Sequence, residues 1–205
     1  RHTRYISVTG VQTCALPICK QLQAALAKQG LKGDVQTTID SRGLVVSLVS
    51  RHVVFDADSA VLTARGQEVV DALAPALKAI DAPLEIDGHT NQEPVKPKYF
   101  ATDWDLSAAR AVTVLRRLNE TFGIPADRLQ ISAFGHTRPL VPVSEPDSQE
   151  INKRVDIVVL TTLPADSAAQ LPDAAAQLGL PGAGDRKSTR LNSSHTDISR
   201  MPSSA

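Results

Sequence analysis

Two short stretches decide the fold of this chain: Ile86-Asp87-Gly88-His89-Thr90-Asn91 and Trp104-Asp105-Leu106-Ser107-Ala108-Ala109-Arg110-Ala111. Leu84 and Ile86 alternate with Glu85 and Asp87, which predicts a buried strand that ends at Gly88. In the second, Ser107 is a favourable N-cap for the Ala-rich, apolar-periodic run that follows. We therefore expect a strand, a long loop and then a helix from Ser107 to Phe122.

This arrangement predicts a small polar pocket between a strand end and a helix start, joined by the loop from Asn91 to Asp103. Arg110 would lie in the first turn of the helix, from which its guanidinium reaches back over the strand end. A guanidinium in this position favours a carboxylate ligand. The alternative is structural: Arg110 caps the edge of the sheet or pairs with Asp103 or Asp105.

The rest of the central sequence alternates between strand and helix periodicities. The expected elements are a short helix over Lys20–Gln29, a hairpin of Val35–Ile39 and Leu44–Leu48, a continuation of that sheet at Val53–Phe55, an amphipathic helix from Thr63 to Ile80, and strands at Leu129–Phe134 and Val155–Leu160. This order predicts an α+β fold, a two-layer sandwich in which two main helices cover one face of a mixed β-sheet.

The two ends differ in character from the centre. Residues 1–18 and 186–205 resemble translated sequencing-adapter sequence, the alternative being ordinary disordered tails, and we leave them out of the fold prediction. Between them we expect a lead-in over residues 19–40, a domain over 41–161 and a flexible tail rich in Ala and Pro over 162–185.

Composition excludes several classes of protein. The whole chain has 22 basic and 22 acidic residues, but without the two ends 16 basic and 21 acidic residues remain, which disfavours nucleic-acid binding. Cys14 and Cys19 both lie at the N-terminal end, so the domain has neither a disulfide framework nor a Cys-based metal site. No apolar run is long enough for a transmembrane helix.

Four motifs point to one family when they are taken in order. They are Gly88-His89-Thr90, the stretch from Trp104 to Ala111, Phe134-Gly135-His136-Thr137-Arg138-Pro139 and Asn152-Lys153-Arg154-Val155. In this order they resemble the OmpA-like peptidoglycan-binding domain, over roughly Leu44 to Leu160. The Trp-acidic-Leu-Ser sequence and the long Pro-containing loop are most similar to flagellar stator proteins of the MotB type.

The resemblance implies non-catalytic binding of the diaminopimelate-containing stem peptide of peptidoglycan, without a cofactor or metal. Arg110 matches the family arginine that grips the ligand carboxylate, and its planar fork suits that group. The predicted ligand-binding residues are Arg110, Asn91, Lys153, Thr90, Asn152 and Trp104.

Two positions depart from the family pattern. Asn91 stands where the family usually has Asp, and Lys153 stands where it usually has the first Arg of Asn-Arg-Arg. A neutral hydrogen bond from Asn91 is roughly half as strong as a charge-assisted one. We expect a retained but weaker or altered stem-peptide preference, with Asp87, Asp103 or Asp105 supplying the missing charge.

Some residues keep two interpretations. Trp104 either covers the helix start or forms a wall of the ligand site, and Asn152 either fixes its loop or touches the ligand. The competing function is a metal-dependent hydrolase, built on Asp87, His89, Asp103, Asp105 and His136. Neither the histidine spacing of a zinc site nor a Gly-x-Ser-x-Gly nucleophile motif supports it.

The resemblance also implies partners and a location. A stator protein would form a homodimer and reach a MotA-like channel subunit through an N-terminal transmembrane helix absent from this sequence. The domain would then lie in the cell envelope, on the extracytoplasmic side of the cytoplasmic membrane. The alternative within the family is an envelope tether unrelated to motility.

Overall fold

The computed structural model describes residues 24, 27, 28, 30, 31, 34–49, 54–56, 58–91 and 97–177. Residues 1–18 and 186–205, Val53 and most of the helix expected over residues 20–29 lie outside the described residues. Nothing in the described part therefore bears on the adapter-like ends.

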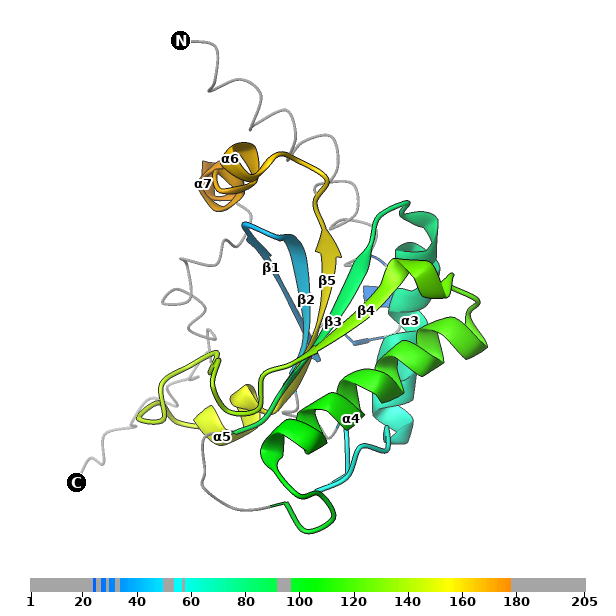
Figure 1. Ribbon diagram of the computed structural model, residues 1–205, viewed down its shortest axis with the longest axis vertical. Coiled ribbons are helices and arrows are strands. Elements are labelled where there is room, and N and C mark those ends of the chain that lie inside the picture. Colours follow the sequence, from blue (N-terminus) through cyan, green and yellow to red (C-terminus); the bar gives the residue numbers. More distant parts are fainter. Residues whose placement is uncertain are drawn as a thin grey trace, which may run out of the picture.

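A five-stranded mixed sheet forms the centre of the molecule (Figure 1). Its strand order is β1-β2-β5-β3-β4, where β3 and β4 are parallel and every other pair is antiparallel. The strands are β1 (Val35–Asp40), β2 (Gly43–Val49), β3 (Leu84–His89), β4 (Leu129–Ala133) and β5 (Arg154–Leu160). The expected hairpin is the β1–β2 pair, and its first strand lies in the predicted lead-in.

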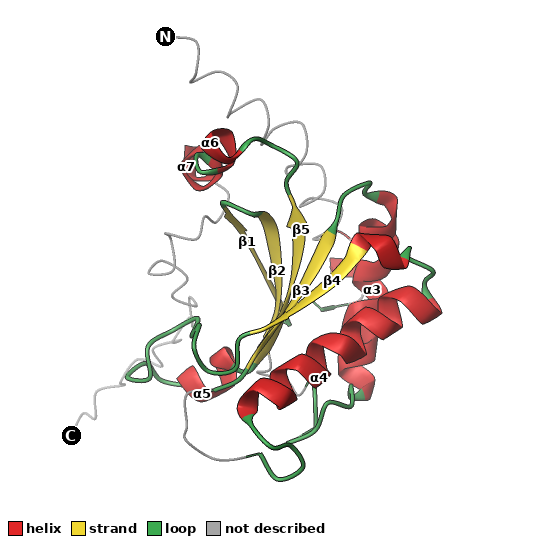
Figure 2. Ribbon diagram, viewed as in Figure 1, coloured by secondary structure: helices red, strands yellow, loops and turns green. Residues whose placement is uncertain are grey.

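Two main helices cover one face of this sheet, which confirms the predicted α+β two-layer fold (Figure 2). Helix α3 (Ala64–Ala79) begins as expected at Thr63, whose hydroxyl accepts a 3.0 Å hydrogen bond from the backbone N–H of Gly66. Helix α4 (Asp103–Arg116) continues into a π-helical turn at Arg117–Thr121.

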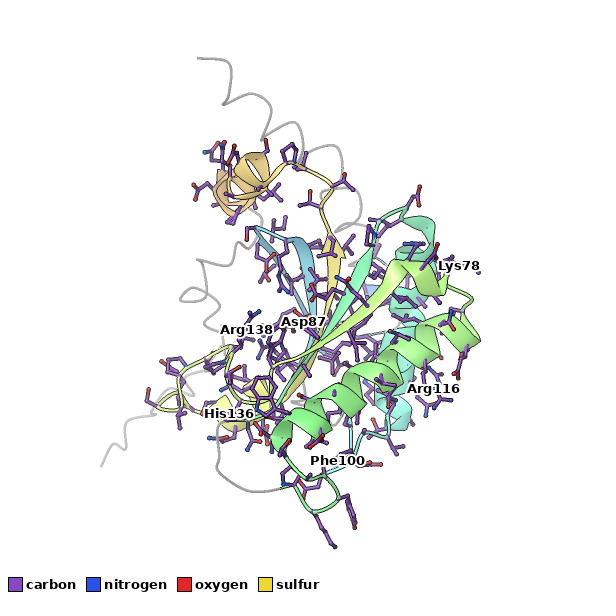
Figure 3. All side chains as sticks on the ribbon, viewed as in Figure 1. Lys78, Asp87, Phe100, Arg116, His136 and Arg138 are labelled. Atoms are coloured by element: carbon purple, nitrogen blue, oxygen red, sulfur yellow. The ribbon has the colours of Figure 1, made fainter. Side chains whose placement is uncertain are left out.

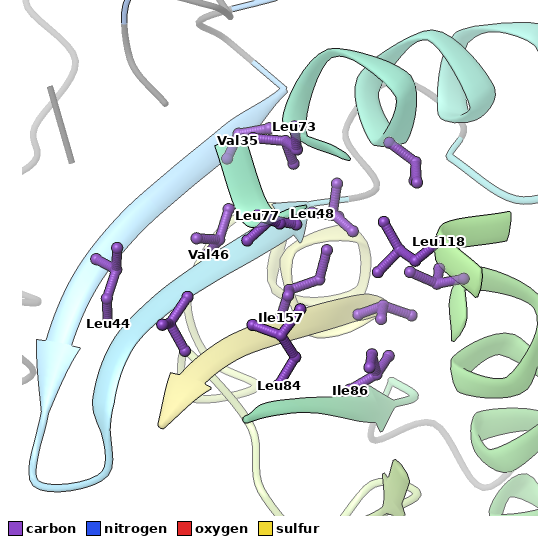
Figure 4. Packing of buried hydrophobic residues seen from close by; sticks show 14 of the residues in the cluster. Val35, Leu44, Val46, Leu48, Leu73, Leu77, Leu84, Ile86, Leu118 and Ile157 are labelled. Carbon is purple, nitrogen blue, oxygen red and sulfur yellow. The ribbon is translucent and has the colours of Figure 1, made fainter. Parts of the chain in front are cut away.

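The core lies between these helices and the sheet (Figure 4). Every second residue of each central strand points toward the helices, as the period of a half-buried strand requires. The side chains at these positions are almost fully buried; they include Leu44, Val46, Leu48, Leu84, Ile86 and Ile157, packed against Leu73, Leu77 and Leu118.

Both predicted boundaries of the opening stretch are wrong. β3 runs through Gly88 to His89, because a glycine in extended backbone does not end a strand when its neighbours pair. Helix α4 begins four residues before Ser107, with Thr102 as its N-cap. Ser107 is instead fully buried in the second turn, and Arg110 follows at the end of that turn.

Residues outside the central elements also differ from the prediction. A flexible tail was predicted over residues 162–185, but part of this segment is helical, with α6 at Ala165–Ala168 and α7 at Leu171–Gln177. Leu171, Ala174 and Ala175 of α7 are buried and join the core beside β1. A helix α5 (Ser148–Asn152) and a 3-10 turn at Ala126–Arg128 were not expected. Phe55 forms only an isolated bridge with Leu62.

None of the helices in the described part has the length and apolarity needed to cross a membrane.

Candidate ligand-binding site

A small cavity of about 120 Å³ lies where the end of β3 meets the start of α4. We call it the β3–α4 pocket. It is lined by Asp58, Thr90, Asn91, Pro97, Asp103, Leu106 and Lys153. Two carboxylates and one ammonium group therefore share its wall. A ligand that carries both an ammonium and a carboxylate matches this set of charges.

The start of α4 is fixed by a capping box. The Thr102 side chain accepts from the Asp105 backbone N–H, and the Asp105 carboxylate accepts from the Thr102 backbone N–H at 2.9 Å. This motif satisfies two backbone donors that would otherwise lack partners. Asp105 is thus committed to the helix end and does not line the pocket.

Asp103 joins three segments at the pocket. Its Oδ2 atom accepts a 3.0 Å hydrogen bond from the His136 backbone N–H and lies 2.5 Å from His136 Nδ1. The Thr90 hydroxyl donates to the same oxygen at 3.4 Å. Partial burial opposes ionisation, but the His136 contacts outweigh it and lower the pKa of Asp103. Asp103 therefore remains an anion at neutral pH.

The close approach of α4 to β3 depends on Gly88. A Cβ atom at this position would lie 2.0 Å from the backbone oxygen of Ser107. The Ser107 hydroxyl donates to the Trp104 carbonyl and accepts a 3.1 Å hydrogen bond from the Gly135 backbone N–H. Gly88, Ser107 and Gly135 thereby hold the helix, β3 and the loop after β4 together beneath the pocket.

Arg110 lies behind the pocket wall rather than on it. Its side chain is buried, its Nε atom donates to the Ser59 carbonyl at 2.9 Å, and Nη2 lies 3.5 Å from the Asp56 carbonyl. The guanidinium also packs over the Phe55 ring at 5.2 Å. Burial lowers the pKa of Arg110 to about 10, against the favourable charge of Asp58. Arg110 is therefore a protonated anchor for the loop that carries Asp58.

The structure brings together three of the six residues predicted to bind ligand. Thr90, Asn91 and Lys153 line the pocket. Asn152 is fully buried and fixes its loop, because its amide makes three hydrogen bonds with the backbone of Leu140 and Val141. Trp104 is 45% exposed, so it does not cover the helix start as a core residue would.

Asp58 is the pocket residue that sequence reasoning missed. It adopts a left-handed backbone conformation with φ of 50°, which is uncommon for a residue other than glycine and best tolerated by Asn and Asp. The available signal was the pair Asp56 and Asp58 between two apolar segments, which is typical of a tight turn. The sequence suggested that another carboxylate replaces the negative charge missing at Asn91. Asp103 lines the pocket and can do so, whereas Asp87 lies on the opposite side of the sheet.

The residues of the alternative hydrolase site do not come together. Asp103 and His136 are paired at the pocket, Asp105 caps α4, and Asp87 and His89 line a separate cavity on the other face of the sheet. Within the described ranges, no group of three or more His, Cys, Asp or Glu side chains is arranged to hold a metal ion.

Comparison with known proteins places this geometry in a family. Residues 54–153, which include both walls of the pocket, match the OmpA family. This chain carries an OmpA-family domain. The match begins just before the loop that carries Asp58 and ends at Lys153. It confirms the resemblance to OmpA-like domains that the four sequence motifs indicated.

Curated relatives of the OmpA-family domain include motility proteins. Motility protein B of Bacillus subtilis (strain 168) is 24% identical over 142 residues, which cover 68% of this chain and 54% of that protein. The chain spans little more than half the length of several curated relatives that it matches.

Solved structures share the fold of the OmpA-family domain. A protein of Desulfovibrio vulgaris described as MotB-like has a TM-score of 0.64 at 23% identity, covering 77% of this chain and 98% of its own. The cell wall anchor of the T6SS from Pseudomonas aeruginosa has a TM-score of 0.60 at 25% identity, covering 68% and 96%.

Proposed function

We propose that the OmpA-family domain anchors its protein to the cell wall by binding the peptidoglycan stem peptide in the β3–α4 pocket. The observation that carries this proposal is the set of charges on the pocket wall, where Asp58, Asp103 and Lys153 line one cavity of about 120 Å³. A diaminopimelate residue presents an ammonium and a carboxylate on one carbon. Its ammonium would lie between the two Asp residues and its carboxylate on Lys153.

The departures from the family pattern fit this assignment. Asp103, which remains charged through its contacts with His136, supplies the carboxylate that Asn91 lacks. The ammonium group of Lys153 is a point charge, whereas the guanidinium of the usual arginine is planar and can donate two parallel hydrogen bonds. Lys153 therefore binds a carboxylate with less directionality than arginine does. We therefore expect binding that is real but weaker than in a domain with Asp and Arg at these two positions.

Replacing Lys153 with glutamine should weaken binding to the wall about tenfold, because a hydrogen bond to a charged group contributes about 1.5–3 kcal/mol. Co-sedimentation with purified sacculi measures this effect. Arg116→Gln is the matched control, since Arg116 is exposed at the far end of α4 and pairs with Glu120 (Figure 3). Equal retention of both variants would show that the pocket does not bind the wall.

Replacing Asn91 with aspartate should strengthen binding about fivefold, because a neutral acceptor becomes a charged one facing the ligand ammonium. The same sedimentation assay applies. Gln177→Glu adds an equal charge on the exposed end of α7 and should leave retention unchanged. Unchanged or weaker retention of Asn91→Asp would mean that the ligand ammonium does not approach the end of β3.

Two kinds of anchor are candidates for the whole protein. The relationship to motility protein B supports a homodimeric flagellar stator subunit in the cell envelope that works with a MotA-like channel subunit. The similarity to the T6SS cell wall anchor supports a tether unrelated to motility. A MotA-like gene directly upstream would support the stator, and a secretion gene cluster would support the second candidate.

A further inference from the structure

The face of the sheet that α3 and α4 leave uncovered carries charged side chains across its middle. Ser47, Asp156 and Asp87 stand side by side on β2, β5 and β3, and the next row holds Arg154 and His89. A cavity of about 380 Å³ lies on this face, three times the volume of the β3–α4 pocket. We call it the sheet-face cavity.

On one wall of the sheet-face cavity, two carboxylates each have an oxygen atom that accepts no hydrogen bond from the described residues. Asp87 is 1% exposed; its Oδ2 accepts from Arg42 Nη1 at 2.6 Å, but its Oδ1 has no partner among the described residues. Asp156 Oδ2 accepts from Arg154 Nε at 3.1 Å and lies 3.3 Å from His89 Nε2, while its Oδ1 also lacks a described partner. Burial of such oxygens without a hydrogen bond is costly.

The two carboxylates are close enough to share one cation. Asp87 and Asp156 are direct cross-strand partners, so their Cβ atoms are about 5 Å apart. An ammonium group has three donors and fits between two such acceptors. Burial lowers the pKa of His89, against the effect of Asp156, so its ring is neutral at neutral pH and adds no positive charge to those of Arg42 and Arg154 beside the two carboxylates.

The other wall offers a prepositioned guanidinium. Arg138 lies over the Phe134 ring at 3.8 Å, and Phe134 in turn stacks on His89 with ring centroids 5.3 Å apart. The Arg138 side chain has neither a hydrogen-bond nor a carboxylate partner in the described part of the chain. Figure 3 shows it on the same side of the sheet as Asp87, beside the cavity that both residues line. A stacked guanidinium with free donors is suited to bind a carboxylate with two hydrogen bonds.

We infer that the sheet-face cavity is a second ligand site, which binds a small zwitterion of the α-amino acid class. The ammonium group lies between Asp87 Oδ1 and Asp156 Oδ1, and the carboxylate lies on Arg138. The neutral His89 ring separates the two charged ends. This site is independent of the β3–α4 pocket, because β3 presents Asp87 and His89 to one face of the sheet and Thr90 and Asn91 to the pocket at its end.

The test is a titration of the full chain with alanine, followed by NMR signals of the His89 and Phe134 rings. We expect a saturable shift with alanine. Acetate and methylammonium, which each carry one half of the charge pattern, should need at least about tenfold higher concentrations for the same shift. Arg138→Gln should weaken alanine binding about tenfold without loss of folding, because this side chain is exposed. Arg116→Gln is again the matched control.

Three results would overturn the inference. They are the absence of a saturable shift with alanine, an equal affinity for alanine in Arg138→Gln and the parent protein, and an affinity for acetate equal to that for alanine. A second variant, Asp87→Asn, tests the opposite wall: it should also weaken alanine binding while leaving any response to acetate unchanged. Loss of the acetate response in this variant would contradict the assigned orientation.

Discussion

Replacing Gly88 with alanine should lower the free energy of unfolding by about 3 kcal/mol. The added Cβ atom would lie 2.0 Å from the Ser107 backbone oxygen and 2.7 Å from its carbonyl carbon. Backbone atoms cannot rotate away as a flexible side chain can, so α4 must move off β3 or the strand must distort. Urea unfolding followed by circular dichroism measures the loss.

Gly123→Ala is the matched control for this substitution. Gly123 has φ of +65°, but its Cβ would meet only the flexible Lys78 ammonium at 3.6 Å. Its cost is therefore conformational, about 1 kcal/mol, and leaves the packing of α4 unchanged. A loss for Gly88→Ala no larger than that for Gly123→Ala would show that the helix does not depend on this contact. Because a displaced α4 also carries Asp103 away, Gly88→Ala should bind sacculi poorly even where it is still folded.

The fold was predictable because its main signals are local. Alternation along Leu84–Asp87 and the helical spacing that follows Thr63 each specify an element without reference to the rest of the chain. The errors at Gly88 and Ser107 have one common cause. Both residues take their places from a contact between elements, in which a small residue on the strand admits the helix backbone. Periodicity and capping preferences do not carry that information, and the better cap, Thr102, lay within the predicted loop.

The site was predictable only in part, for a related reason. Thr90, Asn91 and Lys153 follow or precede strands that are neighbours in the sheet, so motif order was enough to bring them together. Asp58 comes from a turn that regular periodicity does not describe, and its position depends on Arg110, which is 52 residues further along the chain. The motif identified Arg110 as important, but its two backbone acceptors could be known only from the folded chain.

Replacing Arg110 with methionine should weaken binding to sacculi about 100-fold, the largest functional effect that we expect. Methionine preserves much of the apolar packing over Phe55, but the Ser59 carbonyl loses its donor, and the Asp56 carbonyl keeps only the Ser59 backbone N–H. The loop that places Asp58 on the pocket wall is then released. The unpaired Ser59 carbonyl should lower the free energy of unfolding by about 2 kcal/mol. Sedimentation and urea unfolding measure the two effects separately.

Two further variants separate the loss of geometry from the loss of charge. Arg110→Lys keeps a positive charge beside Asp58 but lacks the planar fork that meets the backbone carbonyls. It should recover part of the stability and still bind about tenfold more weakly than the parent protein. Arg117→Met removes a partly buried side chain and its bidentate contact with Asp71 from the π-helical turn that continues α4. It should lose up to about 1 kcal/mol of stability and retain full binding.

The pattern across these variants distinguishes two roles for Arg110. If Arg110 acts by holding the Asp58 loop, binding follows the order parent protein, Arg110→Lys, Arg110→Met, and Asp58→Asn weakens binding in the same direction. If the guanidinium instead contributes only positive charge, Arg110→Lys binds as well as the parent protein. If Arg110→Met and Arg117→Met both bind sacculi as well as the parent protein, neither Arg110 nor the loop that carries Asp58 takes part in wall anchoring. The β3–α4 pocket would then have to act through Asp103 and Lys153 alone.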